Sequence, residues 1–153
     1  MNDKQIRDIR YGMVFDHIPP GYGTVISGVL KSRVWEEEDH PVYTGEGLTG
    51  RKGPKDIVKL DGIHLKPGCD ALNEIAFIHP DITVNWIEGS ERTEKRRASD
   101  CIGDEIRSSL VPCENTNCIG NDEAPGRYKV LGKEPLTLRC HYCSRKFEAR
   151  YMR

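Results

Sequence analysis

Hydrophobic residues in the first third of the chain change from a strand-like to a helix-like spacing. Loose alternation over residues 6–15, ending in an apolar run, predicts a strand that ends at Asp16. Prolines and a glycine follow, so residues 16–21 are expected to form a turn. Beyond that turn the apolar positions recur at helical spacing, which predicts a helix over residues 23–32. The chain therefore opens as strand, turn and helix.

The middle of the chain repeats this succession of short strands and a helix. The pattern predicts strands over residues 42–45, 55–60 and 83–87 and a second helix over residues 67–78. Glycines are expected to end the first of these strands, and a basic, glycine-rich loop follows over residues 49–54. In the second helix, Glu74 lies outside the apolar stripe, and Pro80 stops the chain from continuing as a helix.

The predicted order is strand, helix, strand, strand, helix, strand. This order is typical of a ferredoxin-like domain, in which two helices cover one face of an antiparallel sheet. Residues 88–100 are strongly polar, which indicates a domain boundary near their end. Residues 128–131 and 136–139 then predict two paired strands. The sequence thus predicts an α+β protein, with a ferredoxin-like domain over residues 1–100 and a small β-rich domain over residues 101–153.

Composition and charge restrict the classes of protein that fit this pattern. The chain has 153 residues, of which 31% are charged and 37% are hydrophobic, and no apolar run approaches the roughly 20 residues of a membrane-spanning helix. We therefore expect no membrane partner. The formal net charge of −1 supplies no overall attraction to nucleic acid. The polar N-terminus lacks the apolar core of a signal peptide, so we expect a cytoplasmic location, where thiols stay reduced.

Four cysteines form two close pairs near the C-terminal end. The first pair is Cys113 and Cys118, and the second is Cys140 and Cys143. This spacing is typical of metal-binding knuckles, because each pair presents two sulfur ligands to one ion. Four thiolates suit Zn²⁺, or a single iron, and leave no position open for a reacting ligand, so we interpret the site as structural, with one Zn²⁺ per chain. The alternatives are two disulfides or reactive dithiols.

Other chemical signals in the sequence are weak. Cys69 and Cys101 have no cysteine close to them and are interpreted as structural thiols. The loop over residues 49–54 lacks the Gly-Lys-Ser/Thr ending of a P-loop. The acidic run over residues 36–39 is interpreted as a solvated loop. Since no nucleophile is paired with a base and no metal position is open, we expect a protein that is not an enzyme.

Several short motifs together resemble one protein family. They are Val14-Phe-Asp-His-Ile-Pro19, Lys55-Asp-Ile-Val-Lys59 and Thr83-Val-Asn-Trp-Ile87, followed by Cys113-Glu-Asn-Thr-Asn-Cys118 and Cys140-His-Tyr-Cys143. In this order they resemble the regulatory chain of aspartate carbamoyltransferase over nearly the whole sequence. The resemblance implies a ferredoxin-like allosteric domain followed by a zinc domain that contacts the catalytic chain. It also implies a non-catalytic subunit of an enzyme of pyrimidine biosynthesis.

The resemblance further implies ligands and partners. Family members bind CTP and UTP as inhibitors and ATP as activator, pair as regulatory dimers, and attach to catalytic trimers. The residues implied to contact the nucleotide are Ile9, Val14, Asp16, His17, Lys55, Lys59, Asn85, Ile87 and Lys95, and those implied to contact the catalytic chain are Asn115 and Asn117. Carboxylate and ammonium groups suit ribose hydroxyls, and cations suit phosphates.

The chain also departs from the family pattern. Ser90-Glu-Arg92 stands in place of a usual Tyr-Glu-Val, and Ser144 stands where Glu is frequent. The loop Gly50-Arg-Lys-Gly-Pro-Lys-Asp56 is longer than usual, so Lys52 competes with Lys55 for the phosphates. The alternative interpretation is a stand-alone zinc-ribbon protein that binds nucleic acid through basic residues in 92–97 and 139–153.

Overall fold

The computed structural model describes residues 8–34, 40–122 and 125–151. The acidic run over residues 36–39, interpreted as a solvated loop, lies outside these described residues. Contacts within the chain divide it into two compact units, one of residues 1–65 and 81–97 and the other of residues 66–80 and 98–153. Each unit contains its own antiparallel sheet.

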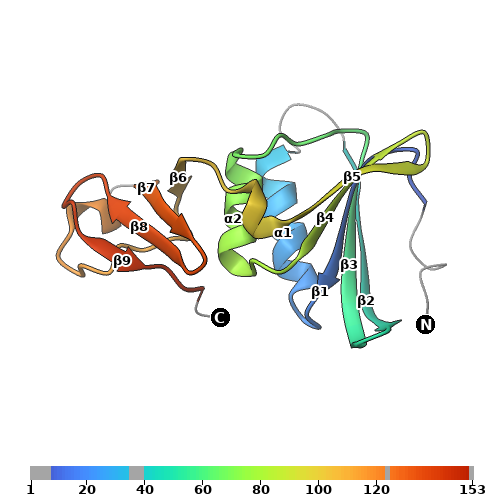
Figure 1. Ribbon diagram of the computed structural model, residues 1–153, viewed down its shortest axis with the longest axis horizontal. Helices are drawn as coiled ribbons and strands as arrows, with labels where there is room; N and C mark the ends of the chain where they lie inside the picture. The colour runs from blue at the N-terminus through green and yellow to red at the C-terminus, as the bar shows by residue number, and fades with distance from the viewer. Residues whose placement is uncertain (1–7, 35–39, 123–124, 152–153) are drawn as a thin grey trace. The chain divides into compact units, whose positions relative to one another are not determined.

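The first unit is built on a five-stranded sheet with the strand order β2-β3-β1-β4-β5. Its strands are β1 (Tyr11–Ile18), β2 (Val42–Gly50), β3 (Gly53–Asp61), β4 (Thr83–Glu88) and β5 (Glu91–Arg97); helix α1 (Gly23–Val34) follows β1, and helix α2 (Asp70–Ile78) lies between β3 and β4 in the chain. The elements from β1 to β4 have the chain order and the strand order of the ferredoxin-like fold (Figure 1). The predicted fold class is therefore confirmed.

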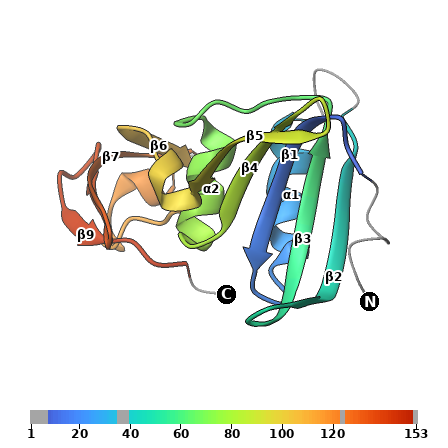
Figure 2. The same ribbon diagram turned by 45° about the vertical axis from the view of Figure 1, so that its right-hand side comes forward.

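Helix α1 lies against one face of the first sheet (Figure 2). The register pairs Phe15 of β1 with Val58 of β3, and both side chains are fully buried. Ile26 and Leu30 of α1 are fully buried as well. Because side chains alternate along a strand, Val14 lies on the opposite face from its neighbour Phe15. The apolar alternation of the central strands therefore leaves a second face for polar residues.

Strand β1 does not end at Asp16, as the pattern predicts, but continues to Ile18. The β1–β3 register shifts between Phe15 and Ile18. His17, which lies within this shift, has a φ of 58°, in the left-handed region that non-glycine residues seldom adopt. A bulge of this kind re-aims side chains without ending the strand. The predicted turn therefore begins only after Ile18.

Strand β2 is longer than predicted, because its glycines form a bulge and do not end the strand. The β2–β3 register shifts between Gly45 and Leu48, and Gly47 has a φ of 62°. Glycine adopts this conformation without the strain that a side chain would add. The chain then turns through Arg51 and Lys52, so the predicted loop over residues 49–54 is a tight β2–β3 hairpin.

The polar stretch over residues 88–100 contains strand β5, which the hydrophobic pattern does not predict. β5 pairs antiparallel with β4, and all of its residues are exposed. An edge strand that is exposed on both faces has no apolar alternation, so periodicity does not reveal it. Its charged side chains also disfavour pairing of this edge with other chains.

The second unit contains a four-stranded sheet with the strand order β6-β7-β8-β9. Its strands are β6 (Glu105–Ser108), β7 (Gly126–Lys133), β8 (Leu136–Cys140) and β9 (Lys146–Glu148), with the 3-10 turns η2 (Ala98–Cys101) and η3 (Ile119–Asn121). The predicted pair of strands corresponds to β7 and β8, and both extend beyond the predicted bounds. β6 and β9 are too short for a period of two to be recognised.

Helix α2 belongs to the second unit by its contacts. It begins at Asp70, later than predicted, and ends at Ile78. Glu74, which was expected outside the apolar stripe, is in fact buried and accepts a hydrogen bond from the hydroxyl of Ser108. That partner removes much of the cost of burying a polar group. Among the described residues, neither helix is long and apolar enough to span a bilayer.

Candidate anion and metal sites

A row of side chains crosses the sheet of the first unit. Val14 of β1 lies opposite Lys59 of β3 and opposite Asn85 of β4. Asn85 lies opposite Lys95 of β5, and Lys59 lies opposite Tyr43 of β2. Residues paired across neighbouring strands point to the same face of a sheet. The structure therefore brings four of the predicted nucleotide contacts, Val14, Lys59, Asn85 and Lys95, into one row.

The centre of this row is largely withdrawn from solvent. Lys59 and Asn85 are each 8% exposed, and Val14 is partly buried against Leu48. The amide nitrogen of Asn85 donates to the carbonyl of Val14 over 3.2 Å, and the ammonium of Lys59 lies 3.6 Å from the carboxylate of Asp8. The row thus presents a sheltered ammonium and an amide beside an apolar surface, which suits a polar ring compound.

At the end of β1, the bulge presents Asp16 and His17 to different partners. The Oδ1 atom of Asp16 lies 2.9 Å from the ammonium of Lys55 on β3. The Nδ1 atom of His17 lies 2.9 Å from the hydroxyl of Thr83 on β4. The sequence pattern does not reveal this role of Thr83, because a β-branched residue is common in any strand. Thr83 orients the imidazole, which is the group expected to meet an anion.

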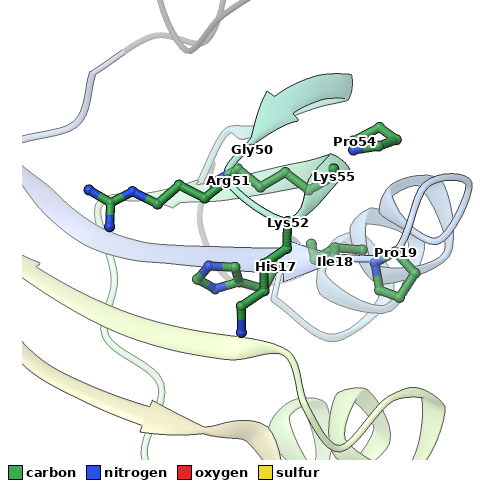
Figure 3. A pocket seen from close by; sticks show the side chains of 9 residues that line it. His17, Ile18, Pro19, Gly50, Arg51, Lys52, Pro54 and Lys55 are labelled. Atoms are coloured by element: carbon green, nitrogen blue, oxygen red, sulfur yellow. The ribbon is translucent and has the colours of Figure 1, made fainter.

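A cavity of about 470 Å³ opens between the end of β1 and the β2–β3 hairpin (Figure 3). It is lined by His17, Ile18, Pro19, Gly50, Arg51, Lys52, Gly53, Pro54 and Lys55. Cationic and imidazole side chains alternate with apolar ones in this lining. Such a concave site, with cations at fixed places and apolar walls, suits an anionic organic ligand.

The buried carboxylate of Asp56, which follows the cavity residue Lys55 on β3, joins three segments of the first unit. It accepts hydrogen bonds from the backbone N–H groups of Gly21 (2.9 Å), Gly23 (3.0 Å) and Gly47 (2.9 Å). These donors precede α1, begin α1 and form the bulge of β2, so one side chain joins three segments. Sequence spacing carries no signal for donors that lie so far apart along the chain.

The structure divides the predicted nucleotide contacts into separate groups. Of the predicted nucleotide contacts, His17 and Lys55 line the cavity, whereas Lys59 belongs to the row. Asp16 lies between the two groups. It follows Val14 of the row by two positions on β1, and its carboxylate forms an ion pair with Lys55 of the cavity. The row and the cavity therefore lie one after the other along the same strand.

The residues expected to present backbone atoms to a base lie apart from the cavity. Ile9 is buried just before β1. The carbonyl oxygen of Ile87 on β4 lies 2.8 Å from Nε2 of His64, whose ring stacks on Tyr11 with centroids 3.9 Å apart. This carbonyl already has a partner, so a base that binds there must share it or displace the imidazole.

The second unit brings four cysteine sulfurs together. The Sγ atoms of Cys113, Cys118, Cys140 and Cys143 all lie within 4.8 Å of one another. The Cys113–Cys143 and Cys118–Cys140 pairs are each separated by 3.6 Å. A tetrahedral site with metal–sulfur bonds of about 2.3 Å has sulfur–sulfur edges of about 3.8 Å. The cluster therefore fits one tetrahedral ion, and all four cysteines are free thiols rather than disulfides.

Backbone donors and burial act on these thiols in opposite directions. The backbone N–H of Arg145 lowers the pKa of Cys143 to about 7, whereas burial raises the pKa of Cys113 to about 12. The N–H of Gly120 donates to the sulfur of Cys118 over 3.3 Å. Such amide–sulfur bonds favour thiolates, which are the form that binds metal. The donor set suits a soft cation that offsets the charge of clustered thiolates.

Asn121 closes the first cysteine knuckle, and the motif itself does not reveal this role. Its Oδ1 accepts from the backbone N–H of Cys113 over 2.8 Å, and its Nδ2 donates to the carbonyls of Cys113 (3.3 Å) and Asn115 (3.0 Å). A side chain with both donor and acceptor is needed for this arrangement. Asn121 therefore positions the metal ligands without being one.

The two residues predicted to contact a partner lie in the same knuckle. The side-chain oxygen of Asn115 accepts from the backbone N–H of Asn117 over 3.1 Å, and Asn117 is exposed. Two large apolar side chains near them are unusually exposed, Ile119 at 63% and Tyr142 at 39%. Exposed apolar residues beside polar ones are typical of protein interaction surfaces.

Two family models match the chain. Residues 4–99 match the model described as "Aspartate carbamoyltransferase regulatory chain, allosteric domain". Residues 104–153 match the model described as "Aspartate carbamoyltransferase regulatory chain, metal binding domain". The first match contains the sheet row and the cavity, and the second contains the four cysteines.

Curated relatives match over nearly the full length. A protein of Thermococcus sibiricus is 38% identical over 150 residues, which is 97% of this chain and 94% of the relative. One of Methanocaldococcus jannaschii is 35% identical over 146 residues, covering 95% of this chain and 93% of the relative. One of Hyperthermus butylicus is 33% identical over 142 residues, covering 90% and 84%. Each of the three is named "Aspartate carbamoyltransferase regulatory chain".

Proposed function

This chain belongs to the family of aspartate carbamoyltransferase regulatory chains, and we propose that it binds nucleoside triphosphates as an allosteric subunit of that enzyme in pyrimidine biosynthesis. It is a regulatory, non-catalytic chain with an allosteric and a metal-binding domain. We assign the nucleotide to residues 1–100 and the metal and partner contacts to residues 101–153.

The proposed effectors are CTP and UTP as inhibitors and ATP as activator. The row of Val14, Lys59, Asn85 and Lys95 is the single observation that carries this proposal, because it offers ring, hydroxyl and anion contacts on one sheet face. A nucleotide regulates the enzyme only by binding its two states with different affinities.

The proposed roles follow the chemistry of each group. Asp16 and Lys59 bind the ribose hydroxyls, since a carboxylate accepts their protons and an ammonium donates to their oxygens. Val14 packs against the base, whose edge meets the backbone near Ile9 and Ile87. The remaining contacts, made by His17, Lys55, Asn85 and Lys95, are with the phosphates and the adjoining polar edge of the nucleotide.

The proposed metal is one Zn²⁺ per chain, bound by Cys113, Cys118, Cys140 and Cys143. The sulfur–sulfur distances of 3.6 Å support a tetrahedral ion of this kind. When bound, the ion acts structurally, because four protein ligands leave no position for a reactant. Binding of the ion requires that the four thiols stay reduced, as thiols do in the cytoplasm. We therefore propose a cytoplasmic location.

The proposed partners are the catalytic chain of aspartate carbamoyltransferase and a second regulatory chain. Asn115 and Asn117 are the proposed contacts with the catalytic chain, and the exposed Ile119 and Tyr142 beside them support a protein interface there. Because the family covers both domains, it favours this function over a stand-alone zinc ribbon that binds nucleic acid.

Isothermal titration calorimetry with CTP and ATP tests the nucleotide site. Lys59→Ala and His17→Ala each remove a charge-assisted or polar contact worth about 1.5–3 kcal/mol, so affinity should fall roughly ten- to a hundredfold. Lys129→Ala, which removes an exposed cation of β7, is the control and should leave binding unchanged. Unaltered affinity in both site variants would refute the assignment.

A further inference from the structure

A row of charged side chains crosses one face of the sheet in the second unit, where β7, β8 and β9 are adjacent strands (Figure 1). Glu105 of β6 lies opposite Lys129 of β7. Arg139 of β8 lies opposite both Lys129 and Lys146 of β9. All four residues are exposed, and the buried side chains of these strands alternate with them and so point to the other face. We call Lys129, Arg139 and Lys146, which lie side by side on the exposed face, the cationic row.

The cationic row places like charges directly opposite one another. Such pairs repel, and they destabilise an antiparallel sheet. Adjacent strands are about 4.8 Å apart, so three cations on three strands extend over about 10 Å. Within the part of the chain that the structure describes, no residue of the row forms an ion pair. The sheet therefore carries three neighbouring positive charges without a counter-charge from the described residues.

The acidic residue at the end of this row does not offset these charges, because other cations already engage it. Glu105 accepts hydrogen bonds from Arg127 (2.9 Å) and Arg107 (3.2 Å). These hydrogen bonds lower the pKa of Glu105, so its carboxylate stays ionised between the two guanidinium groups. The group of one carboxylate and two guanidiniums has a net positive charge. It therefore adds to the positive charge of the row.

A cavity of about 420 Å³ opens over the centre of the row. It is lined by Asp104, Glu105, Tyr128, Lys129, Arg139, Cys140, His141 and Ser144, all of which belong to the second unit. The two carboxylates come from the β6 side, whereas the two cations come from β7 and β8, and the imidazole and hydroxyl follow β8. Cations beside a hydroxyl and an imidazole suit the oxygens of a phosphate group.

We propose that the cationic row and this cavity form a second anion site, which binds a small molecule with more than one phosphate group. Inorganic pyrophosphate is the simplest ligand of this class. One phosphate contacts only adjacent cations, whereas linked phosphates neutralise more of a row that extends over about 10 Å. The site lies in the other unit from the proposed nucleotide site and has different lining residues. This inference therefore does not rest on the proposed function.

NMR titration of the isotope-labelled, zinc-loaded chain with inorganic pyrophosphate tests this site. We expect the backbone amide signals of residues 128–129 and 139–146 to shift and to reach saturation. Pyrophosphate that binds the cationic cavity of the first unit shifts the amides of residues 50–55 instead, so the two sites are observed separately. Orthophosphate at the same ionic strength should bind the second unit at least about fivefold more weakly, because it reaches fewer cations of the row.

Variants of the row test which cations bind the anion. Lys129→Gln and Arg139→Gln each remove one charge, and we expect each to lower the pyrophosphate affinity of the second unit by at least about fivefold. Lys133→Gln is the matched control, because it removes an exposed cation of the same strand outside the cavity. It should change this affinity by less than about twofold. The affinity for CTP should be unchanged in all three variants.

Thermal unfolding gives a second, independent measurement. In buffer without multivalent anions, Arg139→Gln should raise the midpoint of unfolding, because it removes the middle one of three opposed charges. Pyrophosphate should raise the midpoint of the wild-type chain more than that of this variant, because a ligand stabilises the fold that binds it. A variant that unfolds earlier and loses its zinc shows instead that these cations support the nearby thiolates, which overturns the proposal.

The titrations have further outcomes that overturn this site. Pyrophosphate that shifts only amides of the first unit shows that the row binds no anion. Equal losses of affinity in Arg139→Gln and Lys133→Gln show a general effect of positive charge. Equal affinities for orthophosphate and pyrophosphate contradict the assigned class of ligand. A lower CTP affinity in Lys129→Gln makes the row part of the nucleotide site and not a second site.

Discussion

Two buried charged residues of β3, Asp56 and Lys59, have different roles. The carboxylate of Asp56 is fully buried and accepts three backbone hydrogen bonds, so its charge is satisfied by the protein itself. The ammonium of Lys59 is also withdrawn from solvent, yet the carboxylate near it belongs to the exposed Asp8, at 3.6 Å. Such an exposed partner contributes little, which leaves Lys59 available to a ligand. Asp56 is therefore a structural residue and Lys59 a binding residue.

Removal of the Asp56 carboxylate should destabilise the first unit. Asp56→Ala leaves the N–H groups of Gly21, Gly23 and Gly47 without their acceptor, and we expect a loss of about 2–4 kcal/mol in the free energy of unfolding. Asp81→Ala, which removes an exposed ion pair with Arg97, is the control and should cost less than about 1 kcal/mol. Urea denaturation measures both, and equal effects would show that Asp56 does not join these segments.

At the scale of elements, the period of the apolar positions identifies the helices and strands that bury one face. Helix α1 and strand β3 follow from the pattern because their buried apolar residues, Ile26 and Leu30 in α1 and Val58 and Leu60 in β3, recur at helical and at strand spacing. Strand β5 and the bulges of β1 and β2 do not follow from it. Pairing with β4 determines β5, and backbone conformation at His17 and Gly47 determines the bulges. Neither factor has a periodic signature.

The candidate sites also differ in how far the sequence predicts them: some of their residues are linked by a recognisable spacing, and others are not. Cysteine spacing predicts the metal cluster because both members of each pair lie within one knuckle. The family resemblance indicated Lys59 and Asn85, and the register places them in one row. Hydrogen-bond partners that no spacing rule links, such as Thr83 for His17 and Asn121 for Cys113, become apparent only when the chain is folded.

A hydrogen-bonded side chain in α2 provides a test at this scale. Asn73 is fully buried, donates to the carbonyls of Gly68 (3.1 Å) and Glu105 (3.2 Å), and accepts from the N–H of Gly103 (3.0 Å). It therefore joins α2 to β6 and to the segment before β6. Asn73→Ala should lower the free energy of unfolding by about 2–3 kcal/mol, because it leaves buried backbone groups unpaired.

The control for this change is Asp70→Asn, at an exposed position in the first turn of the same helix. It removes a charge that favours the helix N-terminus, at a cost of less than about 1 kcal/mol. Chemical denaturation of both variants, with hydrogen exchange of residues 101–108, measures the difference. If exchange in this segment is unchanged in Asn73→Ala, the hydrogen bonds of Asn73 do not hold α2 to β6.

At the scale of the whole molecule, two divisions of the chain differ in the placement of α2. The family models divide it between residues 99 and 104, whereas the contacts place residues 66–80 with the second unit. The boundary that we expect near residue 100 stays a prediction. Hydrogen bonds of Asn73 and Glu74 with β6 account for the grouping of α2. A helix can thus belong to one domain by family and share contacts with the next.

A bound zinc ion should stabilise the fold of the four-stranded sheet in the second unit. We expect elemental analysis of the reduced protein to find one zinc per chain. Each thiolate must lose a proton to bind the ion, so acid or a strong chelator should release zinc and unfold residues 104–153. Circular dichroism and zinc release, followed together, measure this coupling. Reduced protein that contains neither zinc nor iron and keeps this sheet folded would contradict it.

The last prediction separates the roles of the two domains. Cys140→Ser removes one of four clustered sulfurs, and the small domain that contains it buries too little apolar surface to fold without its metal. The first unit has its own buried core around Phe15 and Val58, so we expect it to stay folded and to bind CTP with wild-type affinity. Attachment to the catalytic chain should fail, because the proposed contacts Asn115 and Asn117 lie in the lost knuckle.

Cys69→Ser is the matched control for this experiment. Cys69 is a free thiol at the start of α2, outside the cluster, so its replacement should preserve both the metal and the partner. Each variant is tested by nucleotide titration and by pull-down with purified catalytic chain. Retained nucleotide with a lost partner in Cys140→Ser is the expected result, because the metal supports only the interface. A variant that keeps its partner but loses nucleotide shows instead that the roles are assigned to the wrong halves of the chain.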